Sequence, residues 1–231
     1  MTKIAIFYHV GQLGNWQEIY AEQINRLKNS GLLQKSSYFH ISINGDEPLP
    51  FIPDNIKKIA YNEDKVLEAN TLEYMWYFAQ NNPDYKILYL HTKGVTRYGV
   101  EPLQEQTKAW RYYMEYFCVD KWEVCINALD TYDTCGVQIE HKATYNTLDE
   151  PIEIDATYYN GNFWWANASY IKQLDTKFLY TSDTPWLRGK SELWIGSGKP
   201  NAANLFTLES QENAYFIDYS PSRYMHAFKQ I

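Results

Sequence analysis

The chain has 231 residues, which is enough for one α/β domain with a sizeable core. Its formal net charge of -7 disfavours nucleic-acid binding, because contact with a polyphosphate backbone needs a basic surface. Aromatic residues make up 17% of the chain, and tyrosine and tryptophan rings line carbohydrate and nucleotide sites as well as cores.

Neither a membrane anchor nor an export signal is expected. No apolar run is long enough to span a bilayer, and the first residues run straight into a strand pattern, which predicts no signal peptide. Cys118, Cys125 and Cys135 fit no zinc or disulfide spacing, so we expect a reducing, cytoplasmic setting. Peripheral contact with a membrane stays open.

The first 95 residues predict alternating strands and helices, which is typical of an α/β protein. The expected strands cover residues 3–9, 37–43, 57–61 and 87–90. Helices are expected from residue 16 to a stop at Ser30 and Gly31, with Asn15 as the cap, and over residues 66–81.

The second half of the chain is richer in loops. A loop is expected over 94–99, followed by a long helical region over 102–129 with an interruption near Val119 and Asp120. The remaining expectations are a strand at 133–139, a polar loop at 141–151, a turn and aromatic strand at 156–166, a helix at 168–174, a loop and helical turn at 188–196 capped by Ser191, and a strand at 203–208. We treat 1–231 as one domain, with a nucleotide-binding half at 1–99 and an acceptor- and sugar-binding half at 100–231.

The end of the fourth predicted strand is the first candidate site. Its apolar run stops abruptly at His91, Thr92 and Lys93, and Gly94 lets the backbone turn there. In open α/β sheets, ligands bind beyond the carboxyl ends of the strands. A lysine there can neutralise a diphosphate, while His91 and Thr92 can donate hydrogen bonds to it. The alternative is a solvated lysine beside a structural histidine.

A second candidate is the segment that begins at Asn160, Gly161 and Asn162. Gly161 allows a ligand to approach the backbone closely, and the two amides offer donors and acceptors to a poly-hydroxyl ligand. Trp164, just after them, belongs to a pair of tryptophans that we expect to be core on one face and site wall on the other. The alternative is a common Asn-Gly turn.

The third candidate is Glu192, which lies close to Trp194 in the sequence. A carboxylate beside aromatic rings can serve as a general base. The alternative is a glutamate that is favoured at the start of a helix by the helix dipole. Asp133 and Asp155 are weaker candidates of the same kind.

The first half of the chain resembles the nucleotide-binding half of glycosyltransferases of the GT-A fold. In those enzymes a helix containing Asn and Ala precedes an apolar strand, and the strand ends in an Asp-X-Asp motif that holds Mn²⁺ or Mg²⁺. Here the segment from Glu68 to Leu72 begins the corresponding helix, and His91-Thr92-Lys93 replaces the acidic motif.

Nearly the whole chain is similar to a group of bacterial and viral glycosyltransferase-like proteins. The shared motifs follow one another in order: Tyr8-His9, Ser30-Gly31-Leu32, His91-Thr92-Lys93-Gly94, Gly161-Asn162-Phe163-Trp164-Trp165-Ala166 and Glu192-Leu193-Trp194-Ile195. The resemblance implies a single GT-A-like, Rossmann-like domain with a mixed central sheet flanked by helices.

The resemblance also implies an activity. A sugar would pass from a nucleotide-sugar donor to a glycan or lipid-linked acceptor, as in polysaccharide biosynthesis, with inversion and with Glu192 as the base. Because a lysine cannot bind a divalent cation, we expect no metal and no other cofactor, with the charge of the leaving diphosphate offset by Lys93, Arg97 or His91.

The remaining roles are implied in the same way. His9 and Gly11 would lie near the nucleotide, and the sugar or acceptor would meet Asn160, Gly161, Asn162, Trp164 and Trp194. Two other functions remain open, namely a non-catalytic module that binds a nucleotide sugar or glycan, and a hydrolase of nucleotide sugars. For the hydrolase we find no nucleophile elbow or metal cluster in the sequence.

Overall fold

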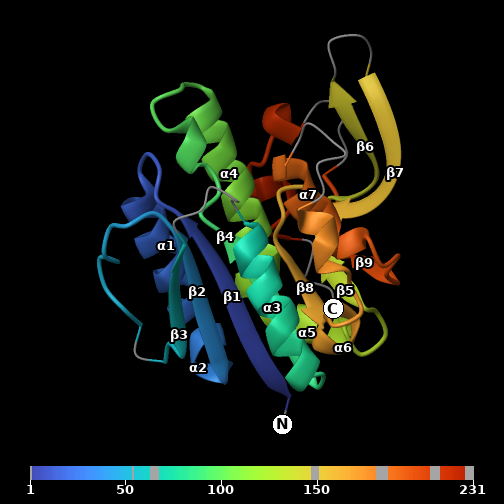
Figure 1. The fold of residues 1–231 in the computed structure, drawn as a ribbon. Coiled ribbons are helices and arrows are strands. Elements are labelled where there is room, and N and C mark those ends of the chain that lie inside the picture. The colour runs from blue at the N-terminus through green and yellow to red at the C-terminus, as the bar shows by residue number, and fades with distance from the viewer. Residues whose placement is uncertain are drawn as a thin grey trace.

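The computed structural model describes residues 2–53, 55–62, 68–146, 151–180, 187–208 and 214–226 (Figure 1). A central sheet of seven strands has the order β3-β2-β1-β4-β8-β5-β9, and a separate two-stranded sheet contains β6 and β7. The fold is therefore a mixed α/β, Rossmann-like architecture, as the sequence predicts.

The strands and helices have the following bounds. The strands are β1 Lys3–Gly11, β2 Tyr38–Asn44, β3 Lys58–Asn62, β4 Tyr85–His91, β5 Thr134–Gly136, β6 Ile139–Asn146, β7 Pro151–Tyr159, β8 Trp164–Asn167 and β9 Ala202–Asn204. The α-helices are α1 Trp16–Asn29, α2 Leu32–Lys35, α3 Ala69–Asn81, α4 Leu103–Glu115, α5 Trp122–Ala128, α6 Ala168–Ile171 and α7 Leu187–Leu193. Short 3₁₀ turns are Val95–Arg97, Thr176–Leu179, Trp194–Gly196, Ala214–Phe216 and Pro221–Arg223.

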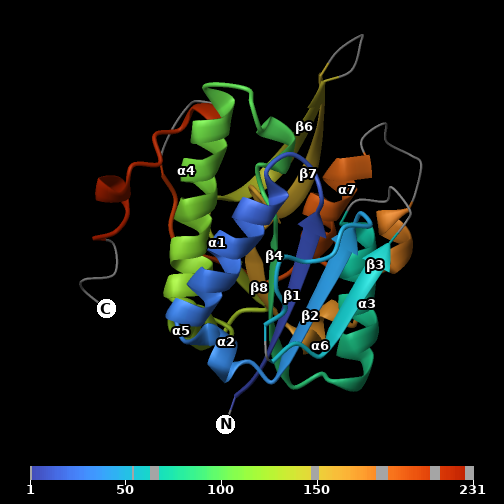
Figure 2. The same ribbon diagram turned by 90° about the vertical axis from the view of Figure 1, so that its left-hand side faces the viewer.

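Helices cover both faces of the central sheet. Figure 2 shows α1 and α4 on one face and α3 and α6 on the other. One apolar core lies under α1 and α4, and a second lies under α3 and α6. Because both faces are covered, β1 and β4 are almost wholly apolar and buried along their length, which explains why their sequences read as continuous apolar runs.

The left half of the sheet is parallel and the right half is mixed. β1 pairs in parallel with both β2 and β4, and β3 pairs in parallel with β2. β8 enters antiparallel between β4 and β5. All the strands of the parallel half therefore end at the same edge, which lies toward the top of Figure 1.

The first half of the chain agrees closely with the sequence prediction. α1 begins at Trp16, and Gly31 follows its end with a left-handed backbone of φ 78°, as a helix stop requires. Asn15 occupies the cap position but makes no capping hydrogen bond, because its amide donates to Glu18 instead. The helix expected over 66–81 is α3, and residues 66 and 67 lie outside the described residues.

The prediction of a polar loop over 141–151 was wrong. The described residues of this segment belong to β6 and β7, which pair in an antiparallel hairpin, while 147–150 lie outside the description. The hairpin stands apart from the central sheet in Figure 1. Apolar residues alternate with polar ones along both strands, and Ala143 of β6 packs with Ile154 and Ala156 of β7 around Leu193. The exposed polar residues between them gave the segment the composition of a loop.

Other boundaries of the second half also differ from the prediction. The strand expected at 133–139 ends at Gly136, because Gln138 has a left-handed backbone of φ 52° and turns the chain out of the central sheet into β6. The last strand is only Ala202–Asn204, and the helix expected over 168–174 ends at Ile171. Ser191 lies inside α7 and is not its cap.

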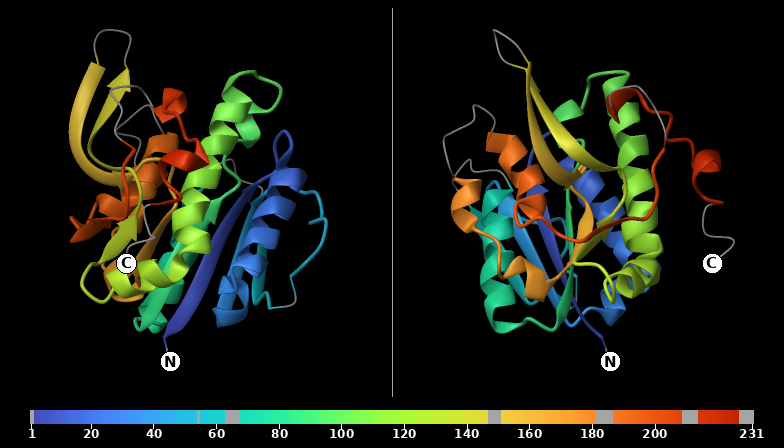
Figure 3. Two further views of the ribbon diagram at one scale, coloured as in Figure 1. Left: turned by 180° about the vertical axis from the view of Figure 1, so that it is seen from behind. Right: turned by 90° about the vertical axis from the view of Figure 1, so that its right-hand side faces the viewer.

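The interruption predicted in the long helical region is confirmed. α4 passes at Tyr116–Asp120 into a π-helical turn before α5 begins at Trp122. The segment from 214 to 226 lies against α4 (Figure 3), where Tyr219 stacks on Trp110 at 5.9 Å between ring centroids. The segment 214–226 thus packs on α4, which covers one face of the central sheet.

Candidate active site at the ends of β1 and β4

The ends of β1 and β4 form a topological switch point. The chain leaves β1 through α1 on one face of the sheet and reaches β4 through α3 on the other (Figure 2). His9 and His91 are directly paired across the two strands. In open α/β sheets, ligands bind where the connections of two neighbouring parallel strands lie on opposite faces of the sheet. The candidate residues of both strands therefore lie where a ligand is expected.

His9 is held as a neutral imidazole. Its side chain is 5% exposed, and Nδ1 lies 2.9 Å from the hydroxyl of Thr71 at the start of α3. Burial lowers the pKa of His9 to about 4, and the negative charge of Glu68 opposes this lowering while the positive charge of His91 adds to it. His9 therefore acts as a hydrogen-bonding group and carries no charge at neutral pH.

A buried carboxylate, Glu68, lies at the centre of the site. Its Oε2 accepts hydrogen bonds from the hydroxyl of Tyr89 at 2.8 Å and from the amide of Asn162 at 2.6 Å. Its Oε1 lies 3.4 Å from Nδ1 of His91. We call Glu68, Tyr89, His91 and Asn162 the Glu68 cluster. Sequence reasoning used Glu68 only to mark the start of a helix, because its partners are distant in the sequence.

The turn at 160–162 lies directly against this cluster. Nε2 of His91 is 3.1 Å from the carbonyl oxygen of Gly161. Gly161 has a φ of 97°, and a Cβ placed on it would come within 2.5 Å of the sulfur of Met114. Asn162 follows with a φ of 60°, which is unusual for a residue other than glycine. The turn therefore needs glycine for both its backbone and its space.

The side chains of Asn162, Trp164 and Trp194 are buried and make their hydrogen bonds within the protein. The side-chain oxygen of Asn162 accepts a hydrogen bond from the indole of Trp164 at 2.8 Å. The indole of Trp194 donates to the carbonyl of Asp175, and both tryptophans are fully buried. Asn160 keeps partial exposure and anchors the turn through its backbone N–H, which donates to Gln138. Of these predicted sugar-binding side chains, Asn160 is the one that reaches the surface.

Thr92 fastens the end of β1 to the end of β4. Its hydroxyl accepts a hydrogen bond from the backbone N–H of Gly11 at 2.9 Å, and its own N–H donates to the carbonyl of His9 at 3.0 Å. A Cβ added to Gly11 would meet its nearest neighbours only at 3.8 Å and beyond. Gly11 therefore has no steric requirement for glycine, and Thr92 fixes the ends of the two strands to each other.

Lys93 and Arg97 lie at the two ends of a row of aromatic rings. The Lys93 ammonium is 3.7 Å from the ring centroid of Trp110, and the Arg97 guanidinium is 5.2 Å from that of Tyr215. The two rings meet edge to face at 5.4 Å. We call these four residues the cation–aromatic row. Among the described residues, Nε of Arg97 and Nε1 of Trp110 are buried donors with no acceptor. The sequence did not point to Trp110 or Tyr215.

Glu192 in α7 belongs to the same neighbourhood. The pKa of Tyr89 is raised far above its ordinary value by burial, by the charge of Glu68 and its hydrogen bond, and by the charge of Glu192. The carboxylate of Glu192 therefore lies within electrostatic range of the Glu68 cluster. Its side chain is half-buried, as is that of Arg97. Glu192, Arg97 and Asn160 are thus partly exposed, in contrast to the buried side chains of the Glu68 cluster.

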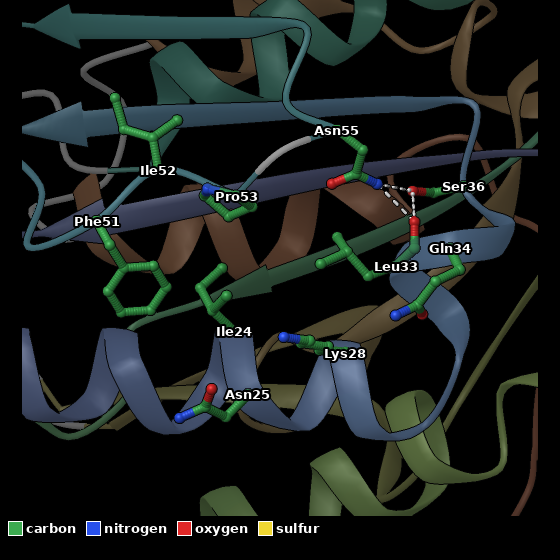
Figure 4. Close-up of a pocket in the computed structure, with 10 residues that line it drawn as sticks. All are labelled: Ile24, Asn25, Lys28, Leu33, Gln34, Ser36, Phe51, Ile52, Pro53 and Asn55. Carbon is green, nitrogen blue, oxygen red and sulfur yellow. Dashed lines mark hydrogen bonds between the residues drawn. The ribbon is translucent and has the colours of Figure 1, made fainter.

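Two of the hollows lined by described residues bear on the position of the site. A cavity of about 440 Å³ between the hairpin and α7 is lined by Asp155 and Leu193, the residue after Glu192. Another of about 330 Å³, shown in Figure 4, lies between α1, α2 and the segment around Phe51. Its wall includes Ser36, which precedes β2, so this second hollow lies away from the strand ends that carry the candidate site.

Several features of the described residues bear on metals, membranes and disulfides. Within the ranges given above, no group of three or more His, Cys, Asp or Glu side chains is arranged to hold a metal ion. In the same ranges, no helix combines the length and the apolar character needed to cross a membrane. Cys118, Cys125 and Cys135 are all buried and free.

The fold and the switch point define a Rossmann-like α/β protein with a polar site at the carboxyl ends of its parallel strands. A family model described as "Domain of unknown function (DUF8361)" matches residues 6–185, and the chain belongs to this family. No curated protein matches the sequence.

Among solved structures, the bifunctional IspDF from Campylobacter jejuni is similar with a TM-score of 0.42 and 9% identity. The match covers 93% of this chain and 50% of that one, so the chain spans about half the length of that protein.

Proposed function

We propose that the protein is a glycosyltransferase that moves a sugar from a nucleotide-sugar donor to a glycan or lipid-linked acceptor. The observation that carries the proposal is a convergence at the switch point. His9 from β1, His91 from β4 and the 160–162 turn are far apart in the sequence and meet around the Glu68 cluster, and the charge of Glu192 from α7 acts on Tyr89 of that cluster.

The donor's diphosphate would be bound near the cation–aromatic row. Lys93 and Arg97 supply positive charge, and the unpaired donors of Arg97 and Trp110 are groups that a phosphate oxygen can satisfy. Tyr215 offers a half-buried ring beside them, on which a flat ligand face can stack. The lysine and arginine take the role that a metal would have in offsetting the charge of the leaving diphosphate, so we propose transfer without a divalent cation.

The sugar and its acceptor would lie over the partly exposed residues Asn160 and Glu192. Asn160 can hydrogen-bond to sugar hydroxyls, and Glu192 would remove the proton from the acceptor hydroxyl as it attacks the anomeric carbon. In this direct displacement the new glycosidic bond forms as the bond to the diphosphate breaks, and the configuration inverts. The cavity between the hairpin and α7 lies beside Leu193, on the side from which an acceptor could approach.

The experiment that tests the proposal is thermal unfolding with UDP, GDP, dTDP and CMP, each with Mn²⁺ and with EDTA. A ligand at about 100 times its dissociation constant adds about 2.7 kcal/mol to the free energy of unfolding, which shifts the melting temperature measurably. We expect one nucleotide to shift it equally in both media. A shift that needs Mn²⁺ would contradict the metal-free site.

A second function is distinguished by the same experiment. If no nucleotide shifts the melting temperature, the glycosyltransferase proposal falls, and a module that binds a glycan becomes the better explanation. Release of free sugar from the nucleotide sugar without an acceptor would instead indicate a hydrolase.

A further inference from the structure

His91 is bracketed by two hydrogen-bond acceptors. On one side, Nδ1 faces the Glu68 carboxylate at 3.4 Å, and on the other, Nε2 faces the carbonyl of Gly161 at 3.1 Å. A backbone carbonyl and an ionised carboxylate can only accept. A neutral imidazole has one N–H and would leave one of these contacts between two acceptors, whereas an imidazolium donates to both. The geometry thus favours a protonated His91 beside an ionised Glu68.

The same two residues hold the turn in an uncommon backbone conformation. Gly161 and Asn162 both have positive φ values, 97° and 60°. The carbonyl of Gly161 is bound by His91, and the side chain of Asn162 donates to Glu68. Gly161 adopts a positive φ readily, whereas the positive φ of Asn162 is uncommon, and such backbone at a residue other than glycine persists where its surroundings fix it. Glu68 holds the turn through two contacts. It accepts a hydrogen bond from Asn162 directly, and it faces His91, which contacts the carbonyl of Gly161.

We propose that Glu68 is a positioning residue of this site, which holds His91 as an imidazolium and thereby clamps the 160–162 turn against the end of β4. This inference rests on the proposed function, because the clamp joins the donor side of the site, at His91, to the sugar side, at Asn160. Glu68 itself is buried and acts on the ligand only through these neighbours.

The other groups around His91 leave the ion pair intact. From β4, the ring of Tyr89 stacks at 6.4 Å and its neutral hydroxyl donates to Glu68. From β1, His9 is neutral at pH 7. Phe163 meets the His91 ring edge-on at 5.2 Å and carries no charge. From α7, Glu192 acts on Tyr89 beside His91, and its charge is negative, so it does not oppose protonation of His91.

The test is a long-range ¹⁵N–¹H spectrum of the histidine side chains, recorded across pH on the full chain and on Glu68→Gln. We expect both ring nitrogens of His91 to be protonated at pH 7.5 in the unaltered protein. In Glu68→Gln the midpoint of the His91 titration should fall by about one to three pH units, since a neighbouring opposite charge is lost. Glutamine keeps the size and an acceptor oxygen, so Tyr89 can still donate to it.

Glu73→Gln is the matched control. Glu73 lies in α3 as well, and its carboxylate also accepts a hydrogen bond from a tyrosine hydroxyl, that of Tyr180 at 2.8 Å, on the protein surface. The control should leave the His91 midpoint unchanged. A His91 with one protonated nitrogen at pH 7.5 in the unaltered protein, or an equal midpoint in Glu68→Gln, would overturn the inference.

Binding of the nucleotide sugar separates this inference from the proposed function. With the donor found by the nucleotide panel, Glu68→Gln should bind the nucleotide sugar about tenfold more weakly than Glu73→Gln does. Equal binding by both variants would overturn the positioning role and leave the glycosyltransferase proposal standing. A protonated His91 in a protein that binds no nucleotide would support the ion pair and overturn the proposed function.

Discussion

His9 and His40 lie on the neighbouring strands β1 and β2, and the sheet buries both. Burial lowers the pKa of each histidine to about 4, and for His40 the charge of Lys58 adds to the effect. Both rings are nearly inaccessible to water, with 5% and 1% of their surface exposed. The folded protein therefore contains two neutral histidines that would be partly protonated in the unfolded chain at pH 6.

These histidines should make the protein sensitive to acid. Each contributes stability at neutral pH that is lost as the pH falls from 6.5 toward 4, where the unfolded chain binds more protons. The loss is about 3 kcal/mol for each histidine. We expect His9→Asn to flatten the decline of the urea midpoint between pH 6.5 and 4.5. The control His226→Asn, at an exposed histidine, should follow the unaltered protein, and equal slopes for all three would contradict the burial argument.

The proposed general base, Glu192, gives a prediction that separates the chemical step from nucleotide binding. Glu192→Gln should lower glycosyl transfer by about 10² to 10⁴-fold, because a general base contributes that much, and should leave nucleotide affinity unchanged. Transfer from the donor that binds, together with nucleotide titration, measures both. Glu153→Gln is the control, since Glu153 lies on the exposed hairpin in a surface pair with Lys142. Full transfer by Glu192→Gln would remove this residue from the mechanism.

Lys93 gives a prediction about charge. Lys93→Met keeps an apolar side chain against Trp110 and removes only the ammonium. Affinity for the nucleoside diphosphate should fall about 10 to 100-fold, while affinity for the nucleoside stays, because charge-assisted hydrogen bonds contribute about 1.5–3 kcal/mol. Lys3→Met, which removes a lysine beside the ring of Tyr85 at the opposite end of β1, should change neither. Equal losses for the two ligands would place Lys93 away from the phosphates.

At the scale of elements, a buried charge network joins α1 to α4 behind the site. Glu115 is 1% exposed and accepts hydrogen bonds from Gln23 and Arg26, both at 2.9 Å, while Arg111 lies 3.5 Å away. Gln23 also donates to the carbonyl of His91 at 3.1 Å. Burial raises the pKa of Glu115, against the effect of the two arginines. The position of two helices and the end of β4 thus depends on one carboxylate.

Removing that charge should loosen the two helices. Glu115→Gln should lower the free energy of unfolding by about 3 kcal/mol, the lower end for breaking a buried pair, since each arginine keeps a second carboxylate in Glu22 or Asp120. Urea unfolding measures this loss. The control is Glu123→Gln at an exposed position of α5, which should change stability by less than about 0.5 kcal/mol. Similar stabilities would show that the network is not structural.

The whole molecule is held together by one sheet that draws strands from both halves of the chain. β4 pairs on one side with β1 and on the other with β8, which lies nearly eighty residues further on. The core under α1 and α4 likewise includes Ile4 near one end of the chain and Tyr224 near the other. The two halves, 1–99 and 100–231, therefore share their packing.

Shared packing predicts a single unfolding transition. Trp16 belongs to the core under α1 and α4, and Trp194 belongs to the core under α3 and α6, so tryptophan emission reports on both. Urea unfolding of Trp16→Phe and of Trp194→Phe would each be followed by tryptophan emission and by far-ultraviolet circular dichroism. Within each variant, the two probes should give coincident curves of the fraction unfolded. Separated emission and dichroism midpoints would show that the halves unfold independently.

The sequence determined the parallel half of the sheet and the residues at its edge. Continuous apolar runs marked β1 and β4, and the polar break at His91 located the strand end, because burial on both faces leaves a local signature. The left-handed stop at Gly31 and the interruption after Glu115 are local in the same way.

The tertiary structure decided which residues meet. Glu68 and Asn162 are 94 positions apart, and no periodicity connects them. The β6–β7 hairpin was missed because its apolar face is small and the exposed polar residues that alternate with it dominate the composition of the segment. Trp110, Tyr215 and Glu68 became site residues through contacts that only the folded chain brings about. The local sequence pattern reflects burial, whereas a site depends on residues that are distant in the sequence and close in space. For this reason the sequence located the strand ends at the edge of the sheet, and only the structure located the Glu68 cluster at the centre of the site.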